Sequence, residues 1–147
     1  MQNLNYGVIG NCSTAALISE KGAIEWLCFP EFDSPSVFAA ILDRQKGGHF
    51  GFKVTSDYKV TQSYVPHTNI LSTHFESEEG AFDVVDFMPC YPTSDGKDFY
   101  RPAEIYRYIR WAKGRPRMKV DYRPAPNYAR GKTIYNVTSQ YVETYSS

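Results

Sequence analysis

Residues 7–42 read GVIGNCSTAALISEKGAIEWLCFPEFDSPSVFAAIL, and their pattern sets the architecture expected of the whole chain. Segments 13–19 and 23–29 are rich in apolar and β-branched residues, which predicts two strands. The short turn between them contains Gly22, and glycine takes a positive φ without steric cost. We therefore expect an antiparallel hairpin near the start of the chain.

The second strand of this hairpin alternates, with Ile24, Trp26 and Cys28 on one face. This pattern predicts that Trp26 and Cys28 belong to the structural core. The alternative for Trp26 is an exposed ring that stacks on a sugar, and Trp111 is a second candidate for that role. Core packing is the more frequent fate of a tryptophan on an alternating strand, and it is favoured for Trp26.

A loop bounded by two prolines, PEFDSP at residues 30–35, follows the hairpin. Proline lacks a backbone N–H and fixes φ, so the strand ladder cannot continue through it. Loops on a rigid scaffold often carry function, which makes Glu31, Phe32, Asp33 and Ser34 the candidate functional residues. The alternative reading leaves Glu31 in solvent and uses Asp33 or Ser34 only as a cap.

That cap would belong to a short apolar helix, predicted over residues 36–42. The rest of the chain predicts further strands at short spacing, over residues 49–55, 58–65, 69–77, 81–88, 104–112, 118–123 and 133–142. With a buried segment at 7–10 this makes about ten strands, which is typical of an all-β, antiparallel β-sandwich. The longest predicted loop spans residues 89–102.

The composition of the chain argues against two classes of partner, nucleic acids and membranes. Lys plus Arg and Asp plus Glu both number 16, so the formal charge is zero and no nucleic-acid partner is expected. No run of 18 apolar residues occurs, so no membrane partner is expected either. Three cysteines, an odd number without a CxxC motif, predict free thiols and a cytoplasmic protein.

The polar residues form no recognisable catalytic or metal-binding motif. His49, His67 and His74 lack metal-ligand spacing, so no metal or other cofactor is expected. Asp83 and Asp86 differ by three positions on a predicted strand and should point to opposite faces. Alternation along the strands of the last third is expected to put some of its basic residues outward, as a solvated face.

The segments GNCSTAALIS (10–19) and KGAIEWLCFPEFDSPSVFAAILD (21–43) resemble the start of the glucoamylase/trehalase-like enzymes of glycoside hydrolase family 15. The resemblance recurs in VDFMP (85–89) and, more loosely, over residues 107–130. It therefore covers nearly the whole chain, and its first motif is long and specific.

Three positions depart from the family pattern. Asn11 and Ser13 stand where Asp and Arg are frequent, and Glu31 stands where Arg is frequent. These changes alter the charge of the signature loop.

The resemblance implies that residues 1–147 are the N-terminal β-sandwich of a longer hydrolase, as part or all of a supersandwich. A catalytic (α/α)6 barrel would follow beyond residue 147, and its two glutamates would hydrolyse an α-glucan or trehalose by inversion without a cofactor. No catalytic residue is then expected in this chain. Phe32, Asp33, Ser34 and Glu31 would face the barrel or the rim of its sugar cleft.

Two other functions remain open: a stand-alone carbohydrate-binding sandwich, and a structural or adhesive β-domain without a ligand. A fragment cut from its barrel would expose an apolar patch and a free strand edge. We therefore expect the isolated chain to form homodimers through residues 32–38 or 133–145.

Overall fold

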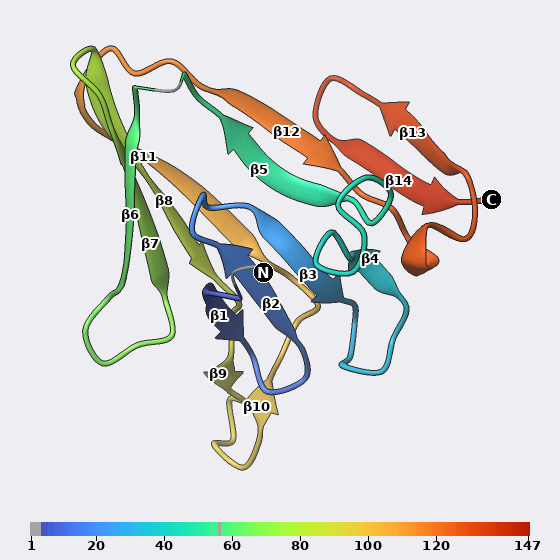
Figure 1. The fold of residues 1–147 in the computed structure, drawn as a ribbon. Coiled ribbons are helices and arrows are strands. Elements are labelled where there is room, and N and C mark those ends of the chain that lie inside the picture. The colour runs from blue at the N-terminus through green and yellow to red at the C-terminus, as the bar shows by residue number, and fades with distance from the viewer. Residues whose placement is uncertain (1–3, 56) are drawn as a thin grey trace.

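The computed structural model describes residues 4–55 and 57–147, and Figure 1 shows that these fold into strands. In chain order the strands are β1 (Tyr6–Gly10), β2 (Ala15–Ser19), β3 (Ile24–Cys28), β4 (Ser36–Phe38), β5 (His49–Lys53), β6 (Lys59–Tyr64), β7 (Leu71–Glu76), β8 (Gly80–Phe87), β9 (Tyr91–Pro92), β10 (Phe99–Tyr100), β11 (Tyr106–Gly114), β12 (Lys119–Arg123), β13 (Thr133–Val137) and β14 (Val142–Ser146). A 3-10 turn, η1, covers Asn127–Ala129. The described residues contain no α-helix.

The strands form two main sheets, and all their pairings are antiparallel. The first sheet runs β1-β2-β3-β5-β12, with β4 also paired to β3. The second runs β11-β8-β7-β6. Two further two-stranded ribbons, β9–β10 and β13–β14, stand apart from these sheets. The prediction of an all-β, antiparallel β-sandwich is confirmed.

The core lies between the two sheets and draws on both. The larger cluster consists of side chains that are at most 4% exposed: Ile9, Ala16, Ile18, Ile24, Leu27, Phe38, Leu71 and Met88. A smaller cluster contains Phe75, Phe82 and Val84, and the rings of Phe75 and Phe82 stack at 4.6 Å between centroids. The alternation of apolar residues along each strand places these side chains on the inner faces.

The predicted helix over residues 36–42 is wrong. Residues 36–38 form β4, in which Phe38 pairs with Leu27 of β3. The backbone N–H groups of Ala39 and Ala40 then donate to the carbonyls of Gly47 and Gly48, at 2.7 and 3.1 Å. These bonds are made with distant parts of the chain, and the apolar run is buried as an extended segment and turn. Neither Asp33 nor Ser34 therefore caps a helix.

A β-bulge on β3 breaks the alternation expected along that strand. Leu17 of β2 pairs with Trp26, but the next residue, Ile18, pairs with Ile24. Glu25 is therefore an extra residue on β3, and such an insertion moves the following side chains to the other face.

Because of the bulge, Trp26 does not lie in the core, where the sequence pattern predicted it. Leu27 and Cys28 are each 1% exposed, whereas Trp26 is half-buried and lies outside the core clusters. Its ring packs instead against Tyr128 of η1, with 6.3 Å between centroids.

Two further segments, residues 133–142 and residues 89–102, also differ from the prediction. The strand expected over residues 133–142 is a hairpin of β13 and β14, which turns where Thr138 N–H bonds the Tyr141 carbonyl at 2.9 Å. The long loop expected over residues 89–102 contains the small β9–β10 ribbon.

A buried ion pair ties the two sheets together. The Asp86 side chain is fully buried and that of Arg107 is 3% exposed; Arg107 Nε lies 2.7 Å from Asp86 Oδ1. The same guanidinium donates to the carbonyls of Phe50 and Gly22 in the opposite sheet, and it lies over the rings of Phe50 and Phe52. Burial raises the pKa of Asp86, and the two hydrogen bonds from Arg107 oppose that rise.

Candidate functional site

The loops that join β1 to β2, β3 to β4 and β10 to β11 gather at one end of the sandwich (Figure 1). Asn11, which is 1% exposed, holds two of them together. Its Oδ1 accepts hydrogen bonds from the N–H groups of Ser13 and Thr14, at 3.1 Å each, and its Nδ2 donates to the Pro102 carbonyl at 3.0 Å. A buried amide therefore fixes the geometry of this end.

The proline-bounded loop is tied to the same frame. The Phe32 N–H donates to the Ser13 carbonyl at 3.0 Å. Within the loop, the Glu31 N–H donates to Ser34 Oγ at 3.0 Å. Ser34 is thus a structural member of the turn, whereas Glu31, Phe32 and Asp33 are exposed, Phe32 by 63%. The structure brings the four predicted residues together as a rigid, solvent-facing loop.

The β9–β10 ribbon adds aromatic rings at this end that the sequence had not singled out. Tyr91 and Tyr100 lie 5.3 Å apart between ring centroids, and Phe99 lies beside them in sequence. All three are about half exposed. We call Phe32 together with Tyr91, Phe99 and Tyr100 the end surface. Aromatic residues on both sides of the polar segment TSDGKD (93–98) were the signal that could have revealed the ribbon.

The carboxylates of Asp83 and Asp86 do not form a catalytic pair. Asp83 bonds His74 and Arg110, whereas Asp86 bonds Arg107 between the sheets, so the two point to opposite faces as predicted. A glycosidase needs two carboxylates that face each other across a sugar bond, about 5–9.5 Å apart. Asp83 and Asp86 do not meet that requirement.

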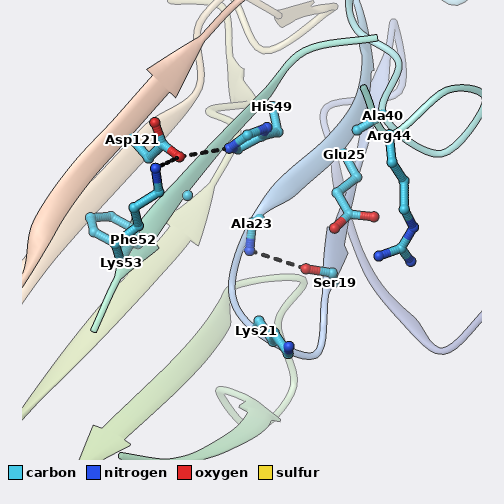
Figure 2. Close-up of a pocket in the computed structure, with 11 residues that line it drawn as sticks. Ser19, Lys21, Ala23, Glu25, Ala40, Arg44, His49, Phe52, Lys53 and Asp121 are labelled. Atoms are coloured by element: carbon cyan, nitrogen blue, oxygen red, sulfur yellow. Dashed lines mark hydrogen bonds and ion pairs between the residues drawn. The ribbon is translucent and has the colours of Figure 1, made fainter. Parts of the chain in front are cut away.

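A hollow of about 290 Å³, lined by both charged and apolar residues, lies over β3 and β5 (Figure 2). At one side of it, Asp121 is held by His49 Nε2 and Lys53 Nζ, each at 3.0 Å, and by Arg123 Nε at 2.7 Å. Burial acts to raise the pKa of Asp121, but the three hydrogen bonds outweigh it and hold the pKa well below its ordinary value. The carboxylate is therefore ionised and fully engaged, which is unsuited to acid–base work.

The carboxylate on the other side of the hollow, that of Glu25, also has a hydrogen-bond partner. Glu25 accepts a hydrogen bond from the Tyr6 hydroxyl at 2.6 Å. Burial, together with this bond to a carboxylate, raises the pKa of Tyr6 to about 12.

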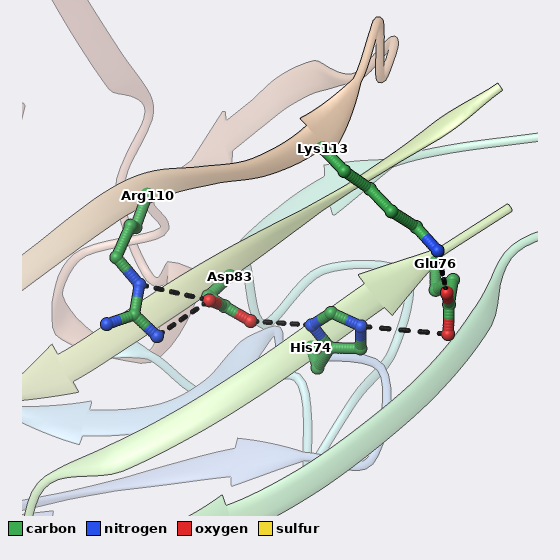
Figure 3. Close-up of polar contacts among 5 residues, drawn as sticks. All are labelled: His74, Glu76, Asp83, Arg110 and Lys113. Atoms are coloured by element: carbon green, nitrogen blue, oxygen red, sulfur yellow. Dashed lines mark hydrogen bonds and ion pairs between the residues drawn. The ribbon is translucent and has the colours of Figure 1, made fainter.

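A chain of charged side chains crosses β7, β8 and β11 (Figure 3). His74 Nδ1 lies 2.6 Å from Asp83 Oδ1, and Arg110 Nη2 lies 2.8 Å from Asp83 Oδ2. The second ring nitrogen of His74 faces Glu76 at 3.8 Å, and Lys113 pairs with the same Glu76. Both ring nitrogens of His74 thus face carboxylates, which leaves neither free for a nucleophile.

Burial acts to raise the pKa of Asp83, but the hydrogen bonds from His74 and Arg110 prevail and lower it. Within residues 4–55 and 57–147, no cluster of three or more His, Cys, Asp or Glu residues has the arrangement of a metal site. A search of the same residues for helices long and apolar enough to cross a membrane found none.

Comparison with known proteins shows which family the chain belongs to. The profile of the trehalase-like N-terminal family matches residues 5–145. The chain belongs to this family. The match covers both sheets and the end surface, and it agrees with the resemblance carried by residues 10–43.

The curated relatives include several archaeal and bacterial trehalases. A trehalase of Thermoplasma volcanium is 36% identical over 132 residues, which are 88% of this chain and 20% of that protein. Trehalase 1 of Sulfolobus acidocaldarius is 51% identical over 85 residues, or 56% of this chain and 14% of that protein. A trehalase of Mycolicibacterium smegmatis is 40% identical over 95 residues, or 62% and 14%. No solved structure gave a significant match.

The matched part of this chain therefore spans a fifth or less of the length of each of these relatives.

Proposed function

We propose that this chain is the non-catalytic N-terminal β-sandwich of a trehalase-like glycoside hydrolase, here called the parent protein. The observation that carries the proposal is the family match over residues 5–145, combined with the small share of each trehalase that the chain spans. The engaged state of Asp83, Asp86 and Asp121 supports it, because none of them is available as a catalytic acid or base.

The parent protein would hydrolyse an α-glucosidic bond, with trehalose as the first substrate to test because the relatives are named trehalases. The family resemblance further suggests an inverting reaction in a catalytic barrel, without a cofactor. A cytoplasmic location is part of the proposal, and the three free cysteines support it because disulfides are rare in that compartment.

The end surface would contact the catalytic barrel. Phe32 supports this role, because an aromatic ring that is 63% exposed on a rigid loop is a typical interface anchor. Glu31 and Asp33 flank this ring in the exposed part of the loop. They would lie near the rim of the sugar cleft and offer hydrogen-bond acceptors to sugar hydroxyls.

Two measurements of glucose release from trehalose test this proposal. The purified chain should release none, while the parent protein should be active. In the parent protein, Phe32→Ala should lower kcat/KM several-fold, whereas the control Tyr108→Ala, an equally exposed ring on β11, should leave it unchanged. Turnover by the chain alone that survives repurification would overturn the proposal.

A stand-alone carbohydrate-binding module is the second candidate, and the four exposed rings of the end surface favour it because sugars stack on such rings. Calorimetric titration of the chain with trehalose and maltooligosaccharides separates the two. Binding by the chain alone that is lost in Tyr100→Ala would favour the module.

We also propose that the isolated chain forms homodimers through exposed apolar residues. The expected contact set needs one correction: Phe38 is 2% exposed and belongs to the core, whereas Phe32 is available. Sedimentation velocity of wild type and Phe32→Asp over a wide concentration range tests this contact.

A further inference from the structure

A pocket of about 600 Å³ opens at the end of the sandwich opposite the end surface. It lies where β5 ends and β6 begins, at the top of Figure 1, whereas the β9–β10 ribbon lies at the bottom. Phe75 of the smaller core cluster lines its floor and is 1% exposed. The other apolar side chains that line the pocket are Phe52, Val54, Tyr58 and Val60.

These lining side chains face the interior but are not fully buried. Val60 of β6 pairs with Phe75 of β7, so the two side chains share the inner face of their sheet. The side chains that pack against the smaller core cluster and are nevertheless only partly buried are Phe52, Val54, Tyr58 and Val60. Removal of their remaining apolar surface from water would be favourable. A mostly apolar pocket of this volume is typical of a small-molecule site.

Two lysines stand at the mouth of the pocket. Lys21 and Lys53 line both the pocket and the hollow of Figure 2, so the two cavities adjoin there. Within residues 4–55 and 57–147, Lys21 has no ion-pair partner. Lys53 shares the carboxylate of Asp121 with Arg123, at 3.0 and 2.7 Å. Positive charge is therefore in excess at the mouth, and the complementary charge on a ligand would be that of an anion.

The rest of the hollow does not cancel this excess. Apart from Asp121, its lining contains one carboxylate, that of Glu25, and this is matched by the guanidinium of Arg44. The Glu25 carboxylate also accepts the hydrogen bond from Tyr6. The uncompensated charge thus lies at the lysines, beside the apolar walls.

We propose that this pocket binds a free amphipathic anion. Its apolar chain or ring would lie between the sheets against Phe75 and Val60, and its carboxylate or similar head would lie between Lys21 and Lys53. A monomeric molecule suits the site better than a membrane, because the apolar walls are recessed between the sheets and do not project from the surface. This inference goes beyond the proposed function and does not depend on it.

Calorimetric titration of the chain with decanoate, at concentrations where decanoate is monomeric, tests the role of charge. Lys21→Gln should raise the Kd of decanoate about three- to five-fold, as expected for one partly exposed ion pair. The Kd of the uncharged analogue decanol should not change. Lys97→Gln is the matched control, because it removes an exposed lysine at the other end of the sandwich. It should leave both values unchanged.

Nuclear Overhauser contacts in the unmodified chain test the position of the ligand. The methylene protons of decanoate should give contacts to the side chains of Phe75 and Val60. Contacts to Phe32 or Tyr91 of the end surface in their place would overturn the inference. So would the absence of decanoate binding, or an equal effect of Lys21→Gln on decanoate and decanol. Binding to phosphatidylglycerol vesicles without binding to monomeric decanoate would assign the lysines to a membrane contact and would also overturn it.

Discussion

The strands β1–β4 and the strands β11–β14 contain similar alternating patterns but reach very different degrees of burial. Inward residues of the first group, such as Ile18, Leu27 and Phe38, are at most 2% exposed. Three inward apolar residues of β11 and β12, namely Ile109, Trp111 and Val120, are 39–67% exposed. Alternation thus specifies which face a side chain occupies, but its burial depends on whether the chain provides an opposing surface.

The β13–β14 hairpin is a second place in the last part of the chain where apolar side chains are exposed. Its exposed apolar and aromatic residues are Tyr135, Val137, Tyr141, Val142 and Tyr145. A two-stranded hairpin is marginally stable without a further partner. The last part of the chain therefore exposes many of its apolar side chains, whereas the first part buries most of them in the core.

Phe82 of the core and its exposed cross-strand partner Trp111 should differ most in how much their truncation lowers the free energy of unfolding. Phe82→Ala should lower the free energy of unfolding by about 3–5 kcal/mol, because it leaves a cavity in the core. Trp111→Ala in the isolated chain should change it by about 0.5 kcal/mol, as expected for an exposed site. Urea unfolding measures both values. Equal losses would mean that the ring of Trp111 is buried in solution.

Removal of the arginine between the sheets should have a comparable effect. Arg107→Ala leaves the carboxylate of Asp86 buried without a partner, and breaking such a pair costs about 3–5 kcal/mol. Arg110→Ala is the control on the same strand; its side chain is 61% exposed and its pair with Asp83 should contribute under about 1 kcal/mol. Similar urea midpoints for the two variants would contradict a tie between the sheets.

The contribution of Trp26 to stability should lie between those of the buried Phe82 and the exposed Trp111. Its half-buried ring packs against Tyr128, so Trp26→Ala should destabilise the chain more than Trp111→Ala and less than Phe82→Ala. Denaturant midpoints for the three variants give the order. A midpoint of Trp26→Ala equal to wild type would indicate a freely exposed ring and would revive sugar stacking at this position.

The pH dependence of stability should depend on Asp121. Its pKa is lower in the folded chain than the ordinary value of about 4, so its contribution is present above about pH 4 and is lost as the pH falls. Asp121→Asn should therefore reduce stability at pH 7 and flatten the acid limb of the stability curve. Thermal unfolding between pH 7 and pH 3 measures this limb. An unchanged slope would show that His49, Lys53 and Arg123 do not stabilise the carboxylate.

The cysteines should differ in reactivity rather than in redox state. Cys12 and Cys90 are exposed, and Cys28 is buried. A thiol reagent should label two groups rapidly in the folded chain and a third only after denaturation. A total below three without reductant would indicate a disulfide.

The strands could be predicted because their alternation is local. The helix over residues 36–42 could not be excluded from sequence, since the partners of Ala39 and Ala40 lie at Gly47 and Gly48. The bulge at Glu25 was equally hidden, because it depends on the register with β2. A single extra residue was enough to move Trp26 out of the core.

The candidate loop could be located from its prolines and its family motif, but its surroundings could not. Asn11 reaches Pro102, 91 positions away, and this contact joins the loop frame to the β9–β10 ribbon. Nothing local in the sequence indicates that Arg107 will meet Asp86 between the sheets. Long-range polar contacts of this kind require the register of both sheets.

Hydrogen exchange, compared between the isolated chain and the parent protein, distinguishes a domain that contacts further polypeptide from a self-contained module. Peptides that cover residues 30–35 and the β9–β10 ribbon should exchange more slowly in the parent protein, while those of β2 and β3 should be unchanged. Identical exchange of all of these peptides in the two proteins would contradict the contact of the end surface with a barrel.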